Sequence, residues 1–272
     1  MTYIRRSPIW PDPRVKPPFG AARINWEHPM ARDLAAYYLL NERAGTTAVD
    51  GATSKYTGGV VGTTVSWDLA GATFGGSGYF YVARAARAAF PVSIAMRGSV
   101  TNTATVQYFM TQGQQVAAGG ICGLAQVAGV GYYVVKAVAA DAAAQPTSGT
   151  LSANAPVTLG GTSITNTTHI AYNNGVAGST VISAAFPSPL WTNVSLGILR
   201  RDVTTFPLTG GLTWAAIWGR VVTQQEHAWL HAEPYAMLEP VIRRRYFPQL
   251  QGLVGELREW RRRQHFHRSG GA

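Results

Sequence analysis

The feature that most constrains the fold is a succession of short apolar segments separated by turn-forming residues. Segments rich in Val, Ile, Tyr and Phe alternate with Gly, Asn, Pro and Thr along most of the chain. Many short strands with turn signals between them are typical of an antiparallel sandwich, and no helix alternates with them as a parallel sheet would require. The expected strands are residues 35–40, 60–69, 79–82, 92–96, 105–110, 121–127, 131–138, 157–159, 169–172, 179–184, 194–198 and 212–222.

Two local signals add detail to this pattern. Asn and Gly tolerate a positive φ, so residues 173–175 (Asn-Asn-Gly) predict a tight hairpin. Thr223 followed by Glu226 forms a capping-box pattern, which predicts a helix over residues 225–232 that stops before Pro234.

The composition indicates one large β-rich domain. Its 272 residues suit a single sandwich, and only 13% are charged, against about 25% in a typical globular protein. The one cysteine, Cys122, lies in an apolar run and is interpreted as a small buried side chain. We expect no secretory signal, because residues 1–8 contain no apolar core, and no membrane span, because Gly and charged residues interrupt the apolar stretch 127–144.

Charge is concentrated at both ends of the chain. Residues 1–32 carry six basic and two acidic side chains, residues 241–272 carry eight and two, and residues 33–240 carry nine of each. A neutral body with basic ends suggests terminal arms that dock on an acidic partner. We expect the body, taken as residues 24–240, to fold without its ends. The expected domains are a proline-rich extended arm (1–30), a β-sandwich (31–233) and a basic tail with an amphipathic helix (234–272).

The candidate partner-binding residues lie in these arms. The N-terminal arm has two aromatic anchors, and residues 249–264 predict a helix with one apolar stripe beside arginines. Protein partners are favoured over nucleic acid or a purely solvated role, and the stripe could pack on its own sandwich or on another subunit. The candidates are Trp10, Phe19, Leu250, Leu253, Leu257, Trp260, Arg261, Arg262 and Arg263.

Several segments match a known family in their order along the chain. An apolar strand is followed by an Asn-Glu-x-x-Gly pattern at Asn41, and a His-led strand by a Tyr-x-Asn-Gly-Val hairpin at Tyr172. Together these segments resemble laminin-G-like, concanavalin-A-like jelly rolls, and the flanks resemble versions encoded by tailed bacteriophages. The resemblance spans about residues 24–240, and residues 85–165 depart from it. It is carried by residues 34–46, 67–78, 168–178 and 208–234, with flanks 24–34 and 231–240.

The resemblance implies an all-β, antiparallel jelly-roll sandwich and a structural role in a phage virion. The chain would be attached to the head or tail through its arms. Its partners would be capsid, portal or tail proteins and further copies of itself. The alternative is a carbohydrate-binding module for host or environmental glycans, with Trp191 as a candidate stacking residue. Trp214 and Trp218 share one face of a strand and are expected in the core.

The chemistry of known sites is sparse in this sequence. Glycosidases on this fold place carboxylates as Glu-x-Asp-x-x-Glu, a spacing that does not occur here. We therefore expect that the chain is not an enzyme and binds no cofactor. Calcium is the one metal considered, with Asp50, Asp68 and Asp202 as plausible acidic ligands, each interpreted as a turn residue. His227 and His231 have the spacing of two metal ligands on a helix but lack a third, and are interpreted as surface or packed side chains.

Overall fold

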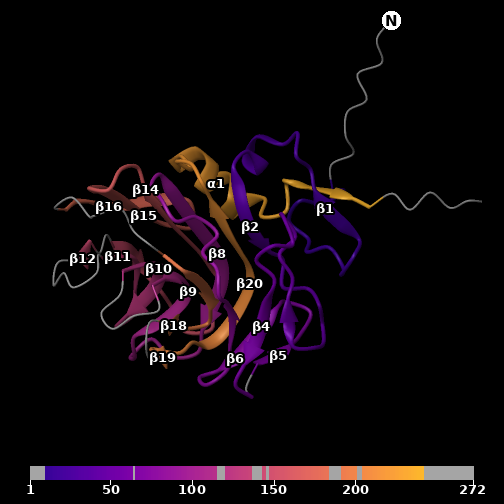
Figure 1. The fold of residues 1–272 in the computed structure, drawn as a ribbon, viewed down its shortest axis with the longest axis horizontal. Coiled ribbons are helices and arrows are strands. Elements are labelled where there is room, and N and C mark those ends of the chain that lie inside the picture. Colours follow the sequence, from indigo (N-terminus) through magenta and orange to yellow (C-terminus); the bar gives the residue numbers. More distant parts are fainter. Residues whose placement is uncertain are drawn as a thin grey trace, which may run out of the picture. The chain divides into compact units, whose positions relative to one another are not determined.

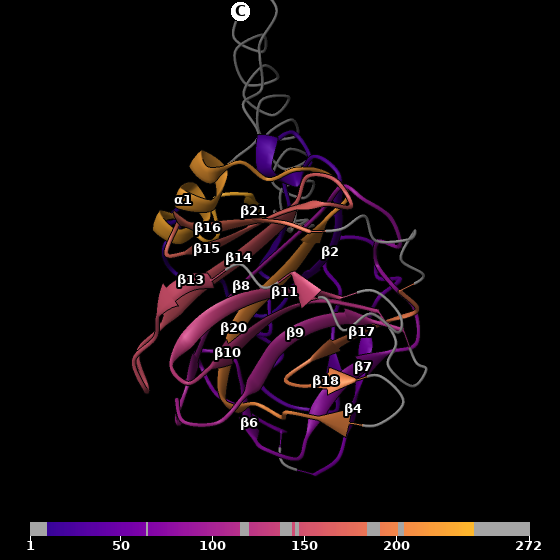
Figure 2. The ribbon, with the colours of Figure 1, turned by 90° about the vertical axis from the view of Figure 1, so that its left-hand side faces the viewer.

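The structure is a computed structural model that describes residues 10–63, 65–114, 120–136, 143–144, 147–183, 191–200 and 204–241. Two large sheets pack face to face as a sandwich, which confirms the expected fold class (Figures 1 and 2). Every strand pairing within these ranges is antiparallel, as expected. Contacts divide the chain into Met1–Pro240 and Val241–Ala272, and all that follows concerns the first unit.

The larger sheet has nine strands in the order β12-β11-β10-β9-β17-β7-β4-β3, and β13 also pairs with β11. Its strands are β3 (Thr47–Ala48), β4 (Gly58–Val61), β7 (Tyr79–Val82), β9 (Gln107–Gly113), β10 (Ile121–Val127), β11 (Val130–Lys136), β12 (Ala143–Ala144), β13 (Thr147–Thr150) and β17 (Asn193–Leu196).

The smaller sheet has eight strands in the order β16-β15-β14-β8-β20-β6-β5. Its long strand β20 pairs with β8 on one edge, while its other edge pairs first with β6 and then with β2. The strands are β2 (Leu34–Tyr38), β5 (Val65–Trp67), β6 (Ala72–Gly75), β8 (Val92–Val100), β14 (Val157–Ser163), β15 (Thr168–Asn173), β16 (Val176–Ile182) and β20 (Thr209–Trp218). The remaining elements are β1 (Ala22–Ile24) paired with β21 (Leu238–Pro240), β18 (Leu199–Arg200) paired with β19 (Thr204–Thr205), the 3-10 turn η1 (Pro29–Ala31) and α1 (Gln224–Ala232).

One expected strand, residues 60–69, is wrong as a single element. It divides into β4 and β5, which belong to different sheets. Gly62 between them has φ +87°, and a Cβ added there would lie 2.5 Å from the Ser77 carbonyl oxygen. The chain therefore turns at a position where only glycine fits, and the apolar residues on either side separate.

The two local signals are confirmed. Asn174 (φ 50°) and Gly175 (φ 82°) form the turn between β15 and β16. Thr223 accepts a hydrogen bond from the Glu226 backbone, and the Glu226 side chain accepts one from the Thr223 backbone, so both halves of the capping box begin α1. Neither helix in the part of the chain described here is long and apolar enough to cross a membrane.

The main core lies between the two sheets. Phe74 and Ile94 from the smaller sheet meet Phe80, Phe109 and other apolar side chains of the larger sheet. Cys122 is fully buried in this core, where its Sγ lies 3.2 Å from the Tyr133 hydroxyl and burial raises the pKa of the thiol to about 12. Its interpretation as a small buried side chain is confirmed.

A second apolar cluster covers the opposite face of the smaller sheet. Trp214 and Trp218 point from β20 into this cluster, while their neighbour Ile217 points into the main core. Both tryptophans are fully buried as expected, but they lie outside the space between the sheets. The cluster is completed by both flanks of the sandwich, including Ile24, Met30, Leu34, Leu230, Tyr235, Met237 and Leu238.

The N-terminal segment from residue 10 is hydrogen-bonded to the sandwich and to the C-terminal flank. The backbone N–H of Trp10 donates to the Leu238 carbonyl (2.9 Å), and that of Tyr235 to the Pro13 carbonyl (2.9 Å). The Lys16 ammonium is enclosed by three carbonyls, and burial lowers its pKa to about 8. The three acceptors are the carbonyl oxygens of Leu40 (2.7 Å), Ala70 (2.8 Å) and Thr213 (2.9 Å). The domain boundaries expected from the sequence stay a prediction.

Candidate functional site

A β-turn over residues 25–28 presents Trp26 at the surface. The Asn25 carbonyl accepts a hydrogen bond from the His28 N–H (3.0 Å), and the Asn25 side chain accepts one from the Glu27 N–H (3.1 Å). Asn is favoured at the first position of such turns because its side chain bonds the backbone two residues on. Trp26 and Glu27 occupy the two central positions, and Trp26 is 55% exposed.

The turn is anchored on both sides. The Asn25 N–H donates to the Met237 carbonyl (2.9 Å), and the His28 Nδ1 accepts from the Met30 N–H (3.2 Å) at the start of η1. Burial lowers the pKa of His28, against the opposing effect of Glu233. His28 is therefore neutral near pH 7, and its Nδ1 can act as the acceptor that this contact needs.

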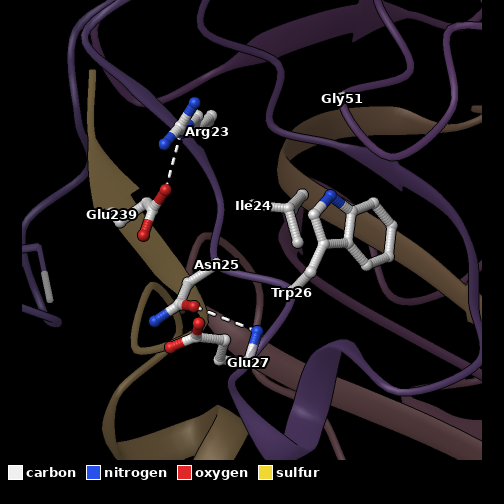
Figure 3. Close-up of a pocket in the computed structure, with 7 residues that line it drawn as sticks. All are labelled: Arg23, Ile24, Asn25, Trp26, Glu27, Gly51 and Glu239. Carbon is white, nitrogen blue, oxygen red and sulfur yellow. Dashed lines mark hydrogen bonds and ion pairs between the residues drawn. The ribbon is translucent and has the colours of Figure 1, made fainter. Parts of the chain in front are cut away.

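Beside the turn lies an open pocket of about 380 Å³ (Figure 3). Figure 3 shows the Arg23–Glu239 pair on one side of Ile24 and the Trp26 indole on the other. An aromatic face next to a few polar groups is the usual composition of small-ligand sites. The lining residues are Arg23, Ile24, Asn25, Trp26, Glu27, Gly51 and Glu239.

The charged side of the pocket is built by strand pairing. Arg23 in β1 and Glu239 in β21 are direct partners across the ladder, so their side chains project on the same face. The Arg23 Nε lies 2.6 Å from the Glu239 Oε1, and the side chains are 70% and 8% exposed, respectively. Arg23 thus neutralises a carboxylate that is almost fully buried.

Asp50 fixes the loop that forms the Gly51 wall of the pocket. Its buried carboxylate accepts a hydrogen bond from the Tyr37 N–H (3.0 Å) in β2. Within its own loop the carboxylate accepts from the N–H groups of Ala52, Thr53 and Tyr56 and from the Thr53 hydroxyl. Asp50 is therefore a turn organiser, as interpreted from the sequence, with both oxygens engaged by protein donors.

Of the two other carboxylates considered for calcium, Asp68 lies within the described residues and also has protein partners. Asp68 accepts from the N–H groups of Ala70 (2.7 Å) and Gly71 (2.8 Å) as a turn residue, and Asp202 lies outside the described residues. Across the ranges described, no three His, Cys, Asp or Glu side chains are grouped as a metal site requires.

The two histidines of α1 both contact side chains of the smaller sheet. His227 stacks on Tyr172 with ring centroids 4.0 Å apart, and its Nε2 lies 3.2 Å from the Thr162 hydroxyl. His231 lies 3.3 Å from the Thr158 hydroxyl. Burial lowers the pKa of His227 to about 3, so it is a neutral packed side chain.

Trp191, the residue predicted to stack on glycans, is only 3% exposed. Its ring packs edge-on against Phe90 with centroids 5.6 Å apart, within the main core. A ring buried in this way offers no face to a sugar in solution. The prediction read an isolated tryptophan as exposed, although the sequence does not reveal which loop residues a sandwich encloses.

The predicted partner-binding residues are only partly within the described ranges. Trp10 is half-buried against the second cluster, and Phe19 is 58% exposed. Neither lines the pocket at Trp26. The candidates of the C-terminal tail, which are Leu250, Leu253, Leu257, Trp260, Arg261, Arg262 and Arg263, lie outside the described residues, and their partner-binding role stays a prediction.

Sequence reasoning missed Trp26. The available signal was its context, because Asn25 before it and the His-Pro pair after Glu27 form a turn pattern, and the centre of a turn is exposed. Arg23 and Glu239 are 216 positions apart, and no local pattern pairs them.

Comparisons with known proteins show the fold. No protein-family model matches the sequence, and no curated protein sequence matches it. Three quarters of the chain (76%) superpose on a Trypanosoma rangeli sialidase solved with sialic acid (TM-score 0.59, 13% identity), and the match spans 34% of the sialidase chain. Another match is domain 4 of an extracellular GH43 arabinanase from Geobacillus stearothermophilus, solved with arabinotriose (TM-score 0.59, 14% identity, 78% of this chain and 99% of the domain).

A third match is botulinum neurotoxin type C, from a structure concerned with its interaction with two ganglioside molecules. Its TM-score is 0.57 at 11% identity, with 74% of this chain and 51% of the toxin chain covered.

The comparisons contradict the prediction that this chain is not an enzyme. That prediction rested on a missing spacing of carboxylates. Yet sialidases and an arabinanase, which are enzymes, contain regions of the same fold. The missing spacing therefore does not separate this chain from enzymes. At 11–14% identity the shared property is a β-sandwich fold that glycan-recognising proteins also use.

Proposed function

We propose that this chain binds carbohydrate through the pocket at Trp26. The observation that carries the proposal is a tryptophan 55% exposed beside a pocket with a polar rim. The indole presents a flat apolar face to solvent, and such a face suits the C–H face of a sugar ring. The rim supplies an indole N–H and carboxylate oxygens, which can bond sugar hydroxyls.

The geometry supports a preformed site. The hydrogen bonds of Asn25 and His28 hold the turn, the ion pair holds Arg23, and Asp50 holds the wall at Gly51. A ligand would therefore meet groups that are already ordered, which lowers the entropy cost of binding. The sugars named with the matched structures belong to those proteins, and they support the ligand class only.

The test is binding of the full chain to a glycan array, followed by calorimetry on the sugars retained. Trp26→Ala should weaken binding at least about ten-fold, which corresponds to about 1.4 kcal/mol. Phe19→Ala is the matched control, since Phe19 is exposed to a similar degree (58%) and lies outside the pocket. Equal affinity of the Trp26→Ala variant and the wild type would show that the pocket at Trp26 is not the carbohydrate-binding site.

A structural role in a tailed-phage virion, with the laminin-G-like relationship, stays a second proposal. It rests on the uneven charge of the chain, with its basic ends and neutral body. Lys16 and Arg23 already have intramolecular partners, so the remaining arginines of the ends would carry any docking on capsid, portal or tail proteins. Mass spectrometry of purified particles would detect the chain, and Leu253→Asp with Trp260→Ala should release it from them.

A further inference from the structure

The pocket at Trp26 differs in charge from the chain as a whole. The chain carries a net charge of +10, but the charged residues that line the pocket are Arg23, Glu27 and Glu239. Arg23 and Glu239 form a pair at 2.6 Å that is neutral as a unit. Glu27 then leaves the lining with one net negative charge.

The single cation of the lining is committed to Glu239. The Arg23 Nε holds the Glu239 Oε1, and losing this partner would leave a nearly buried carboxylate unpaired, so the positive charge of Arg23 stays balanced by Glu239. The terminal guanidinium nitrogens remain available as donors, but the balanced pair offers an anion little net attraction. The anion would also lie beside Glu27, which adds repulsion between like charges.

The polar groups that remain suit hydroxyls. The Glu27 carboxylate and the Trp26 indole N–H make no hydrogen bond to another residue in the part of the chain described. A carboxylate only accepts and an indole N–H only donates, whereas a sugar hydroxyl can do both. Exposed charges act on the pocket mainly at short range, because salt at physiological strength screens them beyond about 8 Å.

We propose that the Trp26 pocket selects uncharged sugars and discriminates against sugars that carry a carboxylate or sulfate. This inference rests on the proposed carbohydrate binding and deepens it by naming the ligand class. It runs against the expectation from the net charge, which would favour acidic glycans. Local pairing determines the selection, because Arg23 is neutralised within the site.

The test uses the full chain and an array of paired oligosaccharides, followed by calorimetry at two salt concentrations. The pairs are lactose with sialyllactose, and arabino-, xylo- and galacto-oligosaccharides with and without a terminal uronic acid. The neutral member of a retained pair should bind at least ten-fold more tightly than its acidic partner. The ratio should narrow at higher salt, because screening weakens the repulsion.

Glu239→Gln sharpens the test, since it removes one negative charge and frees the guanidinium of Arg23. This variant should narrow the neutral-to-acidic ratio several-fold, whereas Asp33→Asn, an exposed acid outside the pocket, should leave the ratio unchanged. Acidic members that bind the wild type as tightly as neutral ones would overturn the selectivity alone. Failure of every array sugar to bind, or binding indifferent to Trp26→Ala, would overturn the proposed function and the selectivity with it.

Discussion

The main core and the second cluster both bury large apolar side chains, but they take them from different spans of the chain. The main core lies between the sheets and takes side chains from strands along most of the chain, among them β2, β9 and β20. The second cluster, on the other face of the smaller sheet, consists of residues from 24–37 and 214–238 together with Ala95. The sandwich therefore has a second layer made by its two flanks.

This difference explains where the candidate site lies. The main core is closed on both sides by sheets, and its tryptophan, Trp191, is buried. The second cluster is covered by short elements and loops, among them β1, β21, η1 and α1, and Trp26 lies in a turn at its edge. The region that completes the fold is also the region that presents an aromatic side chain to solvent.

Among the proposed substitutions, Phe109→Ala should have the largest effect on the free energy of unfolding, because Phe109 is fully buried between the sheets. The expected loss in the free energy of unfolding is about 3–5 kcal/mol, from lost transfer energy and a residual cavity. Urea denaturation measures it. Phe19→Ala, an exposed aromatic, should change stability by less than about 0.5 kcal/mol. Similar losses for both variants would show that the main core does not dominate stability.

Met237→Ala should have a smaller effect on unfolding and a specific effect on the site. Met237 is buried in the second cluster, and its carbonyl holds Asn25 at the start of the Trp26 turn. The expected destabilisation is about 2–4 kcal/mol. Hydrogen exchange should show faster opening of β1 and β21 while β8 and β20 stay protected. Uniform acceleration across both regions would mean that the two clusters unfold as one unit.

The third expected effect is a dependence of stability on pH, which arises from His227 beneath α1. Burial lowers the pKa of His227 to about 3, with Arg220 lowering it and Glu226 opposing both. Since an unfolded histidine titrates near 6.5, the unfolded state binds more protons between these values. His227 therefore stabilises the fold fully above about pH 6.5. Its contribution falls on acidification by at most about 1.4 kcal/mol per pH unit.

Thermal or urea unfolding from pH 7 to pH 4 measures this slope. His227→Gln should reduce it, because Gln does not titrate. A smaller slope should remain from His169, whose pKa burial lowers to about 4. The slope is the quantity to compare, since packing against Gly160 makes any substitution at His227 change the absolute stability. Identical slopes for the variant and the wild type would contradict a neutral buried His227.

Local interactions made parts of this protein predictable from sequence. The capping box at Thr223, the hairpin at Asn174 and the buried Cys122 follow from groups within a few residues or from an apolar run. The strands and the sandwich class follow from alternating apolar and turn residues, because that pattern must bury one face of a sheet.

The tertiary structure alone decided which tryptophans are buried and which residues meet at the site. Trp191 and Trp26 both lie in loops, yet one is enclosed by the main core and the other stands at a turn centre. The Arg23–Glu239 pair depends on β1 and β21 meeting across almost the whole chain. The sequence by itself determined the β class and its local turns and caps. The exposure of a side chain and its long-range pairing depend on the tertiary packing. Residues adjacent in sequence do not determine which surfaces distant parts of the chain will cover.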